Sequence, residues 1–565
     1  MCKSPAGANG EEPRAGEDAA ERGSCVKRAK NVIPAEYRGE FMELFNLAGP
    51  MIIAQTMVFM IGFVSTIFCG HLGKTELASV ALAIAVINVT GISIGSGLSL
   101  TCDTLISQTY GSGNVKQVGV ILQRGVLILL LACFPCWAVL LNTEVLLLVV
   151  QQSPAVASLA QLYVNIFMPA LPACFMYQLQ VRYLQNQGII WPQVVTGIIG
   201  NVLNAVFNYV LLYPLELSVA GSAAANAISQ YFLAVFLFLY IYARGLHKQT
   251  WSGWSLECLR EWGSFVRLAI PSMLMLCLEW WMFEAGGFMA GTISEVELGA
   301  QSVLYEIAVV AYMIPLGLSS AASVRVGNAL GGGKVEQAKL SAKVPVVCGF
   351  SIACVVGAFA IAIKDYIGYI FTTDQEILDR VTDVMIIYGI THIGDATTGV
   401  AGGVVRGAGK QKMGAWSNLV GYYCLGLPLG VSLMFAAKMG IVGLWTGLLV
   451  CVFVQAVVFV TYLCRLDWQQ AATEAQTRAG VQVKAEGEMN NMPSKEAEAT
   501  AAELIDETVD DFLRVQGQAK STSTNVGHVL SPKQLLLRRG LTLFLMLVIF
   551  CVGIVMQIFL LRLLK

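Results

Sequence analysis

Four acidic residues lie inside otherwise apolar stretches, and their side chains are the first candidates for chemistry. They are Glu279 and Glu284 in LCLEWWMFEAGG, Glu306 in SVLYEIAVVAYMIP and Asp395 in GITHIGDATTG. A charged side chain at the centre of a bilayer costs at least about 2.5 to 3.5 kcal/mol on insertion scales, so such an acid is a functional candidate by default. We therefore treat these four carboxylates as candidate proton and cation sites.

Helical spacing predicts which of these side chains can act together. His392 and Asp395 are three residues apart and share a helix face, whereas the five-residue step from Glu279 to Glu284 turns the second carboxylate by about 140°. Glu279 and Glu284 therefore need not share a site. Two alternatives stay open: each acid could be a protonated or hydrogen-bonded link between helices, and His392 could either pack or relay protons.

Aromatic residues neighbour the acids along the chain. They are Trp280, Trp281, Phe283, Tyr305 and Tyr312. A single ring in an apolar helix is usually a packing residue, but rings beside anions favour a bulky organic cation through cation–π attraction and apolar burial. Because either a proton or a cation can neutralise a buried carboxylate, competition for the same acid predicts exchange of protons for organic cations.

The composition excludes several classes of protein. Of the 565 residues, 56% are hydrophobic and 13% charged, against roughly a quarter charged in a soluble protein. The 36 basic and 37 acidic residues nearly cancel, so no basic field for nucleic acid exists. The 15 cysteines show no paired C-x-x-C modules or metal-ligand spacing. The ATP-binding pattern G-x-x-x-x-G-K-[ST] is absent, and we expect no cofactor.

Thirteen stretches have the roughly 20 apolar residues that a membrane-crossing helix needs. We predict them at 47–69, 78–100, 118–141, 155–178, 190–213, 219–242, 265–290, 298–320, 344–363, 384–404, 414–436, 441–463 and 541–561. The polar first 45 residues lack the apolar core of a signal peptide, and a cytoplasmic amino terminus leaves 14 basic residues in inward loops against 4 outside. We therefore expect a cytoplasmic amino terminus and an extracellular carboxyl terminus.

An internal repeat relates the two halves of the chain. At an offset of 220 residues, Gly97-Leu98-Ser99 matches Gly317-Leu318-Ser319, and the residues Gly111, Gly113, Val115 and Gln117 match Gly331, Gly333, Val335 and Gln337. Each copy holds six spans, an even number, so the copies are related by an axis along the membrane normal. The repeat predicts two side-by-side lobes with a cleft between them.

These patterns predict an all-α membrane protein with two six-helix lobes from a parallel internal repeat plus a thirteenth C-terminal transmembrane helix. The predicted parts are a cytoplasmic segment 1–45, an N-lobe 46–243, an inter-lobe linker 244–263, a C-lobe 264–464, a flexible cytoplasmic linker 465–540 and the thirteenth span with an extracellular end, 541–565. The approximate repeat equivalents of the four acids are Phe59, Val64, Val86 and Cys174. The repeat itself therefore does not require acids there, which indicates a special task for the C-lobe.

Long motifs in order along the chain resemble the vertebrate branch of the multidrug and toxin extrusion family, which are proton-coupled organic cation antiporters. They include FCGHLGKTELASV, CDTLISQTYGS, RLAIPSMLMLCLEWW, ELGAQSVLYE, GGVVRGAGKQK and LSPKQLLLRRG. The resemblance implies two lobes around a central cleft and a plasma-membrane location on the secretory, apical face of epithelia.

The resemblance also implies roles for particular residues. Glu279, Glu284 and Glu306 stand at positions important for cation transport, and positions linked to substrate handling are occupied by Asn88, Cys69, Cys133, Trp280 and His392. Asp395 departs from the family pattern, which has glutamate there. The shorter side chain keeps the charge and retracts it by about one methylene, which affects substrate range and proton coupling.

The leading hypothesis is a secondary active multidrug efflux transporter, not an enzyme, that exchanges external protons for intracellular organic cations and drugs by alternating access. Its expected partners are organic cations, protons and the lipid bilayer, without nucleic acid or ATP. A lipid or oligosaccharide flippase of the same superfamily would favour a basic cleft for phosphates, which the acidic candidates argue against. A sodium-coupled exporter stays open, and an ion channel is disfavoured because no pore loop or charge ring is apparent.

Overall fold

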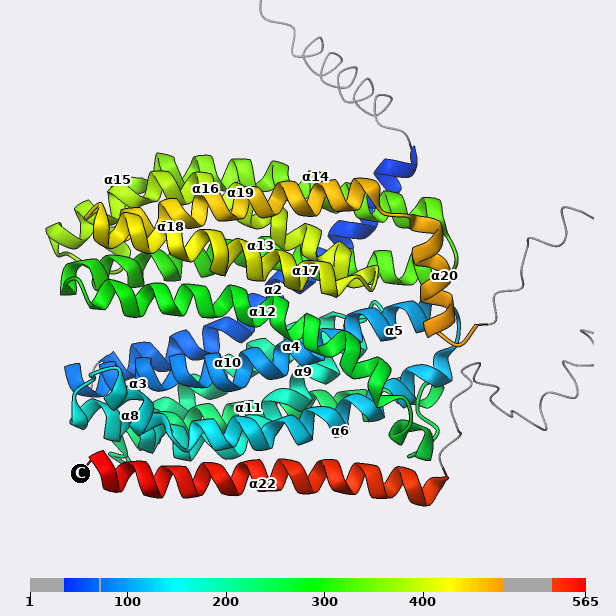
Figure 1. Ribbon diagram of the computed structural model, residues 1–565, viewed down its shortest axis with the longest axis horizontal. Coiled ribbons are helices and arrows are strands. Elements are labelled where there is room, and N and C mark those ends of the chain that lie inside the picture. The colour runs from blue at the N-terminus through cyan, green and yellow to red at the C-terminus, as the bar shows by residue number, and fades with distance from the viewer. Residues whose placement is uncertain (1–34, 71–72, 482–530, 565) are drawn as a thin grey trace, which may run out of the picture.

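The computed structural model describes residues 35–70, 73–481 and 531–564, and within them the chain is helical without β-strands. Apart from the start of its first helix, which lies among the upper helices, the first lobe forms the lower half of Figure 1. Its helices are α2 (Ala35–Gly70), α3 (Lys74–Ile87), η1 (Asn88–Ile92), α4 (Ser93–Ser99), α5 (Thr101–Gly111), α6 (Val115–Leu140), α7 (Thr143–Val149), α8 (Pro154–Phe167), η2 (Met168–Ala170), α9 (Leu171–Gln185), α10 (Trp191–Leu212) and α11 (Ser218–Ala243).

Two short turns, η3 (Leu246–Gln249) and η4 (Leu256–Leu259), lead into the second lobe. This lobe forms the upper half of Figure 1. Its helices are α12 (Trp262–Gly291), α13 (Glu295–Gly331), α14 (Val335–Ala362), α15 (Lys364–Ile367), η5 (Gly368–Ile370), α16 (Gln375–Gly407), α17 (Gln411–Asn418), η6 (Leu419–Gly426), α18 (Leu427–Val431), η7 (Ser432–Ala436) and α19 (Ile441–Arg465). The two-lobed, all-helical architecture confirms the predicted fold class.

Twelve helices in the described part of the chain are long and apolar enough to cross a membrane. They match twelve of the thirteen predicted spans, including the last. The remaining prediction, 384–404, lies within the 33-residue helix α16, which is long enough but less apolar. The polar residues of α16, among them His392 and Asp395, lower its hydropathy, while α13, α14 and α19 pack around it. Burial among other helices thus compensates for its polarity.

The C-terminal helix α22 (Pro532–Leu564) lies along the N-lobe, next to α6 (Figure 1). The Asn142 amide donates a hydrogen bond to the Gly553 carbonyl at 3.1 Å, and the Arg539 guanidinium lies 4.1 Å from the ring centre of Trp262. The helix begins at Pro532, nine residues before the predicted start at 541. The basic segment PKQLLLRRG, which lies before the predicted span, therefore forms the first turns of the helix. Among the described elements, α22 has its main contacts with the N-lobe.

Two predicted non-span segments are helical because other helices support them. The second span was predicted to end at residue 100, but the chain continues as α5 to Gly111 and crosses α13 of the other lobe. Within the predicted flexible linker, α20 (Trp468–Arg478) buries Ala471, Ala472 and Ala475. Its composition would not fold alone, but it packs on α13, α14 and α5. Residues 482–530 of that linker lie outside the described residues.

A glycine stripe brings α16 against α13 in the middle of the C-lobe. Gly399, Gly403 and Gly407 recur every four residues and therefore share one face of α16. A Cβ atom at Gly403 would overlap the Ser319 carbonyl oxygen, and one at Gly399 would lie 2.6 Å from the Tyr312 hydroxyl. Asp395 stands one turn before Gly399 on the same face, so the close packing of α13 and α16 places this carboxylate between them.

Candidate functional site

The C-lobe brings Glu279 and Asp395 together, and we call them the inner pair. Glu279 lies on α12 and Asp395 on α16, and the charges of the two carboxylates interact directly. The Tyr312 hydroxyl on α13 lies within hydrogen-bonding reach of Glu279. Both acidic residues are partly accessible rather than fully buried. The consecutive helices α12 and α13 and the later helix α16 thus build one site that can hold a proton or a cation between two carboxylates.

Glu284 and Glu306 form a second acidic site, the outer pair. Glu284 lies on α12, five residues after Glu279, and its charge interacts with that of Glu306 on α13. Tyr305 lies beside both acids. One Glu306 carboxylate oxygen, Oε2, is buried without a hydrogen-bond partner among the described residues. An unused acceptor of this kind is costly to bury, and a proton or a bound cation would satisfy it.

An aromatic wall of Phe283, Tyr305, Tyr388, His392 and Trp445 connects the two pairs. The Phe283 ring centre lies 6.3 Å from that of Tyr305 and 6.2 Å from that of Trp445. Trp445 meets Tyr388 edge to face at 5.6 Å, and Tyr388 lies 5.8 Å from the His392 ring. Tyr388 also faces Asp395. Phe283 and Tyr305 are partly accessible, whereas Tyr388, His392 and Trp445 are at most 3% exposed. Only the first two can therefore offer a ring face to an apolar cation.

His392 is itself almost fully buried, with 2% of its surface exposed. Its Nε2 atom has no hydrogen-bond partner among the described residues. The nearest ring is Tyr388, whereas the acidic neighbour of Asp395 is Glu279. His392 and Asp395 therefore share a helix, but the charged neighbour of Asp395 is on α12 and is not the histidine.

The N-lobe contributes a short π-helical segment to the interface with α12. Asn88 begins this segment, η1, and is partly accessible. The Trp281 indole on α12 donates a hydrogen bond to the Val89 carbonyl at 3.0 Å. Trp280, the adjacent residue on α12, is also partly accessible. π-Helical turns are frequent at functional sites because they free backbone groups, and the one here gives the N-lobe a contact with the acid-bearing helix.

Cys69 and Cys133 lie elsewhere. Cys69 is fully buried and Cys133 is 1% exposed, both within the hydrophobic core of the N-lobe. Neither sulfur can meet a substrate in this conformation, so the structure gives both cysteines a packing position and does not bring them to the acids. Their suggested link to substrate handling therefore has no direct contact to support it here.

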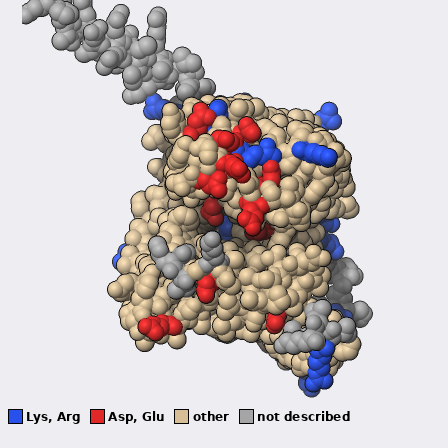
Figure 2. Space-filling model, turned by 90° about the vertical axis from the view of Figure 1, so that its left-hand side faces the viewer, with Lys and Arg blue, Asp and Glu red and all other residues tan. Residues whose placement is uncertain are grey.

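The lobes separate at one end of the molecule. Figure 2 shows that end face on, with a recess between the lobes and acidic side chains gathered on the upper lobe around it. Exposed acids at this end of the C-lobe include Glu295, Asp365, Asp374, Glu376, Asp379 and Asp383. α12 runs toward this open end, so Glu284 lies about 7 Å nearer to it than Glu279 along the helix axis. A cation entering the recess would therefore meet the outer pair first.

The opposite end, where α20 crosses the molecule in Figure 1, is closed by contacts between the lobes. Thr104 Oγ1 of α5 donates to the Arg406 carbonyl at 2.6 Å, and the Gln108 amide donates to the Gly407 carbonyl at 2.9 Å. A Cβ atom at Gly331 would overlap the Gln108 carbonyl, so the helices touch through their backbones. We call this contact the seal; its residues are Thr104, Ser107, Gln108, Gly111, Gly327, Asn328, Gly331, Arg406, Gly407 and Arg478.

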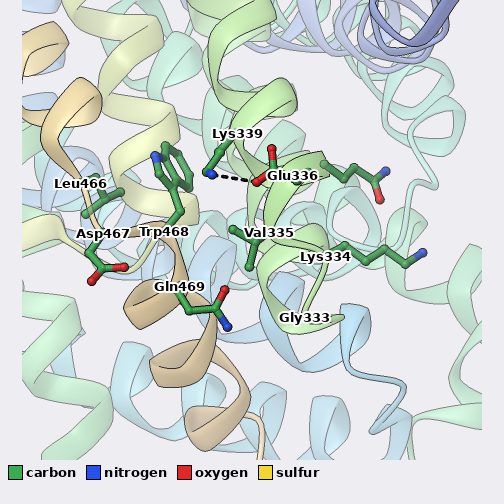
Figure 3. A pocket seen from close by; sticks show the side chains of 10 residues that line it. Gly333, Lys334, Val335, Glu336, Lys339, Leu466, Asp467, Trp468 and Gln469 are labelled. Atoms are coloured by element: carbon green, nitrogen blue, oxygen red, sulfur yellow. Dashed lines mark hydrogen bonds and ion pairs between the residues drawn. The ribbon is translucent and has the colours of Figure 1, made fainter. Parts of the chain in front are cut away.

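A surface groove near the seal is unrelated to the acids. Figure 3 shows it between the start of α14 and the start of α20, lined by Lys334, Glu336, Lys339, Asp467 and Trp468 among others. Lys339 and Glu336 in its wall are paired at 2.7 Å. The groove begins beyond the end of α13, 25 residues after Glu306, which is about 38 Å along a helix. It therefore cannot be part of the cleft that the acids line.

Two residues of the site were not among our sequence candidates. Tyr422 in the π-helical segment η6 is 1% exposed and its neighbours include Glu279, Asp395 and Tyr312. Arg406, which we had counted only as an inward-loop charge, is 9% exposed inside α16. A basic residue in GGVVRGAGK was a visible signal, but its helix was predicted to end at 404. No feature of the sequence distinguishes Tyr422 from the residues around it.

Comparison with known proteins places this geometry in a family. The MatE family profile matches residues 50–210 and 271–432, once in each lobe. The chain is 61% identical to multidrug and toxin extrusion protein 1 of Danio rerio over 556 residues, which is 96% of this chain and 94% of that protein. It is 50% identical to multidrug and toxin extrusion protein 1 of Homo sapiens, covering 93% of this chain and 94% of that one.

A solved structure agrees with the fold. The crystal structure of the eukaryotic MATE transporter AtDTX14 is 30% identical, superimposes with a TM-score of 0.76, and covers 79% of this chain and 100% of its own. The two profile matches start 221 residues apart (271 minus 50), close to the repeat offset found in the sequence. Two equivalent lobes, an acid-lined recess and near full-length similarity all lead to one conclusion: the chain belongs to the multidrug and toxin extrusion family of membrane transporters.

Proposed function

We propose that this transporter exports organic cations and drugs in exchange for protons, with the carboxylates of the C-lobe as shared sites. The observation that carries the proposal is the pairing of four acids beside an aromatic wall within one lobe. The names of the relatives point to drugs and toxins as substrates. Protons and cations compete because either can neutralise the same carboxylates.

The asymmetry between the two ends supports alternating access as the mode of transport. The molecule is open at the end shown in Figure 2 and sealed at the α20 end. Transport requires the opposite arrangement as well, in which the seal opens and the lobes meet at the other end. A transporter that changes between the two only when its acids are neutralised would carry a proton one way and a cation the other. Each pH unit then supplies about 1.36 kcal/mol, roughly a tenfold gradient of a monovalent cation.

The direction of transport depends on orientation in the membrane. The basic loops predict that the α20 end faces the cytoplasm, so the open recess would face outward and receive external protons. The proposed location is the plasma membrane, at the apical face of epithelia, as the family resemblance suggests. α22 ends at the open end of the molecule in Figure 1, which agrees with an extracellular carboxyl terminus in this orientation.

The test uses purified protein in vesicles with an imposed pH gradient. Accumulation of a fluorescent quaternary ammonium dye should follow the gradient and be indifferent to sodium. Glu279→Gln keeps the size of the side chain but cannot ionise, so it should abolish accumulation. The matched control is Asp379→Asn, an exposed acid on α16, which should transport normally.

The outcomes separate the alternatives. Accumulation driven by sodium without a response to pH would replace proton coupling by sodium coupling. Transport of a fluorescent lipid without dye uptake would favour a flippase. Normal dye uptake by Glu279→Gln would remove the inner pair from the transport site.

A further inference from the structure

Arg406 lies on the same face of α16 as the inner-pair residue Asp395. The two positions are eleven residues apart, which is about three helical turns, about 16 Å along the axis and within about 20° in rotation. Asp395 lies near the middle of the helix, and Arg406 is its second-last residue, at the seal. One rigid helix therefore spans the distance between the acids and the contact that closes the α20 end.

The guanidinium of Arg406 is buried without an ion pair in the described part of the chain. Its Nη2 donates to Ser319 Oγ at 2.8 Å, and its Nε is buried without a partner. The charged and titratable groups around it are Asp103 on α5, Arg182 on α9, Glu279 on α12 and Tyr312 on α13. Asp103 is already engaged by Arg182 at 3.4 Å. Asp103 contributes the largest favourable charge at Arg406, Arg182 opposes it, and Glu279 adds a smaller favourable charge. Arg406 therefore lies beside an ion pair of the N-lobe and within the field of a carboxylate of the inner pair.

The main chain at Arg406 is also a structural part of the seal. Its carbonyl accepts from Thr104 and that of Gly407 accepts from Gln108, both on α5 of the N-lobe. Gln108 in turn accepts from Arg478 of α20 at 3.0 Å. Separation of the lobes at this end would break these contacts and let water reach the guanidinium. The sealed state therefore requires a buried, incompletely paired arginine, which is costly unless nearby negative charge offsets it.

We propose that Arg406 is a positioning residue that couples the charge on Glu279 to the closure of the seal. While the inner pair is ionised, its negative charge stabilises the buried guanidinium beside Arg182, and the seal stays shut. A proton on Glu279 removes that compensation, so the sealed state loses stability and the α20 end opens. This proposal rests on the proposed proton exchange, and it supplies the link by which a proton entering from the open end releases the opposite end.

The experiment measures the seal directly, independently of transport. Spin labels on Lys116→Cys in the N-lobe and Lys412→Cys in the C-lobe, both exposed near the seal, report the separation of the lobes by electron paramagnetic resonance. The accessible cysteines of the described chain are first replaced by serine: Cys348, Cys354, Cys424, Cys464 and Cys551. Cys2 and Cys25 are replaced as well. Vesicles at neutral pH without substrate isolate the effect of side-chain charge.

Glu279→Gln mimics the protonated carboxyl and should raise the ratio of open to sealed molecules by at least about threefold, within the range expected for interacting residues. Arg406→Gln should remove this sensitivity, so that Glu279→Gln/Arg406→Gln has the same ratio as Arg406→Gln alone. Arg406→Lys retains the charge and should restore the response. The matched control is Asp379→Asn, an exposed acid on the same helix as Arg406, and it should leave the ratio unchanged.

Two results would overturn the proposal. One is that Glu279→Gln raises the ratio of open to sealed molecules equally in the unmodified protein and in Arg406→Gln. The other is an opening by Asp379→Asn as large as the opening by Glu279→Gln, which also decides the question if Arg406→Gln does not fold. Failure of proton exchange itself would appear differently, as dye uptake that ignores the pH gradient while the label distances respond normally.

Discussion

The two lobes have polar cores of opposite character. In the N-lobe, Ser65, Tyr163, Asn204, Asn208 and Asn226 form a network of neutral side chains with at most 1% exposure for four of them. Ser65 donates to the Asn226 carbonyl oxygen at 2.8 Å, and Asn204 donates to the same atom at 3.1 Å. In the C-lobe, the polar side chains on α12, α13 and α16 include the partly accessible carboxylates of Glu279, Glu284, Glu306 and Asp395.

The difference shows how one repeated fold serves two purposes. Neutral amides and hydroxyls can largely satisfy one another inside the lobe, so they hold α2, α8, α10 and α11 together without needing a ligand. Carboxylates that face each other cannot satisfy one another while both are ionised. They retain capacity for a proton or cation. The N-lobe core is thus satisfied without a ligand, while under the proposed function the C-lobe carries the charge that changes during transport.

The largest effect is expected when a carboxylate of the C-lobe is replaced by a neutral amide of the kind found in the N-lobe network. Asp395→Asn should lower proton-driven dye exchange by at least about tenfold, the effect of roughly 1.4 kcal/mol on the barrier, because Glu279 loses its acidic partner. Exchange is measured in vesicles and normalised to protein content. Asp379→Asn on the same helix should behave like the unmodified protein. Equal exchange by Asp395→Asn would mean that the inner pair acts through one carboxylate only.

Changing the N-lobe network should affect stability instead of coupling. Asn226→Ala removes bonds to Ser65, Asn204 and Tyr163 and leaves buried groups unpaired, which costs about 1 to 3 kcal/mol. The melting temperature in detergent should fall, while the pH dependence of exchange per folded molecule stays the same. A shift of that pH dependence would show that the N-lobe takes part in proton handling.

Lengthening Asp395, the acid that departs from the family pattern, should change substrate preference without abolishing transport. Asp395→Glu keeps the charge and extends it by about one methylene toward Glu279, so exchange should persist with altered preference among cations. Affinity ratios for small and large quaternary ammonium ions should change roughly threefold, less than 1 kcal/mol. The measurement is inhibition of dye uptake by each ion. Identical ratios in both proteins would show that the position of this carboxylate does not select substrates.

The smallest effect is expected at α20, outside the membrane spans. Burial raises the pKa of Glu474, but the hydrogen bond and charge of Lys410 and the charge of Arg478 outweigh it, so the pKa is lowered. A lowered pKa adds stability that is present above the ordinary value of about 4.3 and is lost as pH falls through the folded value. Docking of α20 should therefore be constant near neutral pH and weaken only in acid.

Hydrogen exchange of the α20 amides tests this expectation. Glu474→Gln should exchange modestly faster at pH 7, because Lys410 and Arg478 lose a carboxylate that both contact at 2.8 Å, and it should lose the acid dependence. The effect is small because ion pairs near the surface contribute little. Exchange rates unchanged at pH 7 would mean that the alanine face alone holds α20.

The positions of most helices could be predicted from local sequence pattern, but the contacts between the helices could not. Apolar runs of about 20 residues predicted the spans because a bilayer forces every backbone group to bond within its own helix. The polar tenth span was found in the sequence, although its composition alone falls short, whereas the helices α5 and α20 that reach the seal were missed. Both of the latter helices depend on partners from distant parts of the chain, which hydropathy does not encode.

By itself the sequence determined which side chains carry charge into the membrane: Glu279, Glu284, Glu306 and Asp395 stand out because charge there is expensive. Only the tertiary structure decided that the charge of Glu279 interacts with that of Asp395 and the charge of Glu284 with that of Glu306. It also decided that Cys69 and Cys133 are buried in the N-lobe core, and that Arg406 is part of the seal. The free-energy cost of burying a charged side chain depends on the medium around it, whereas the identity of its partner depends on how the helices pack. The glycines of α16 set that packing through contacts with α13.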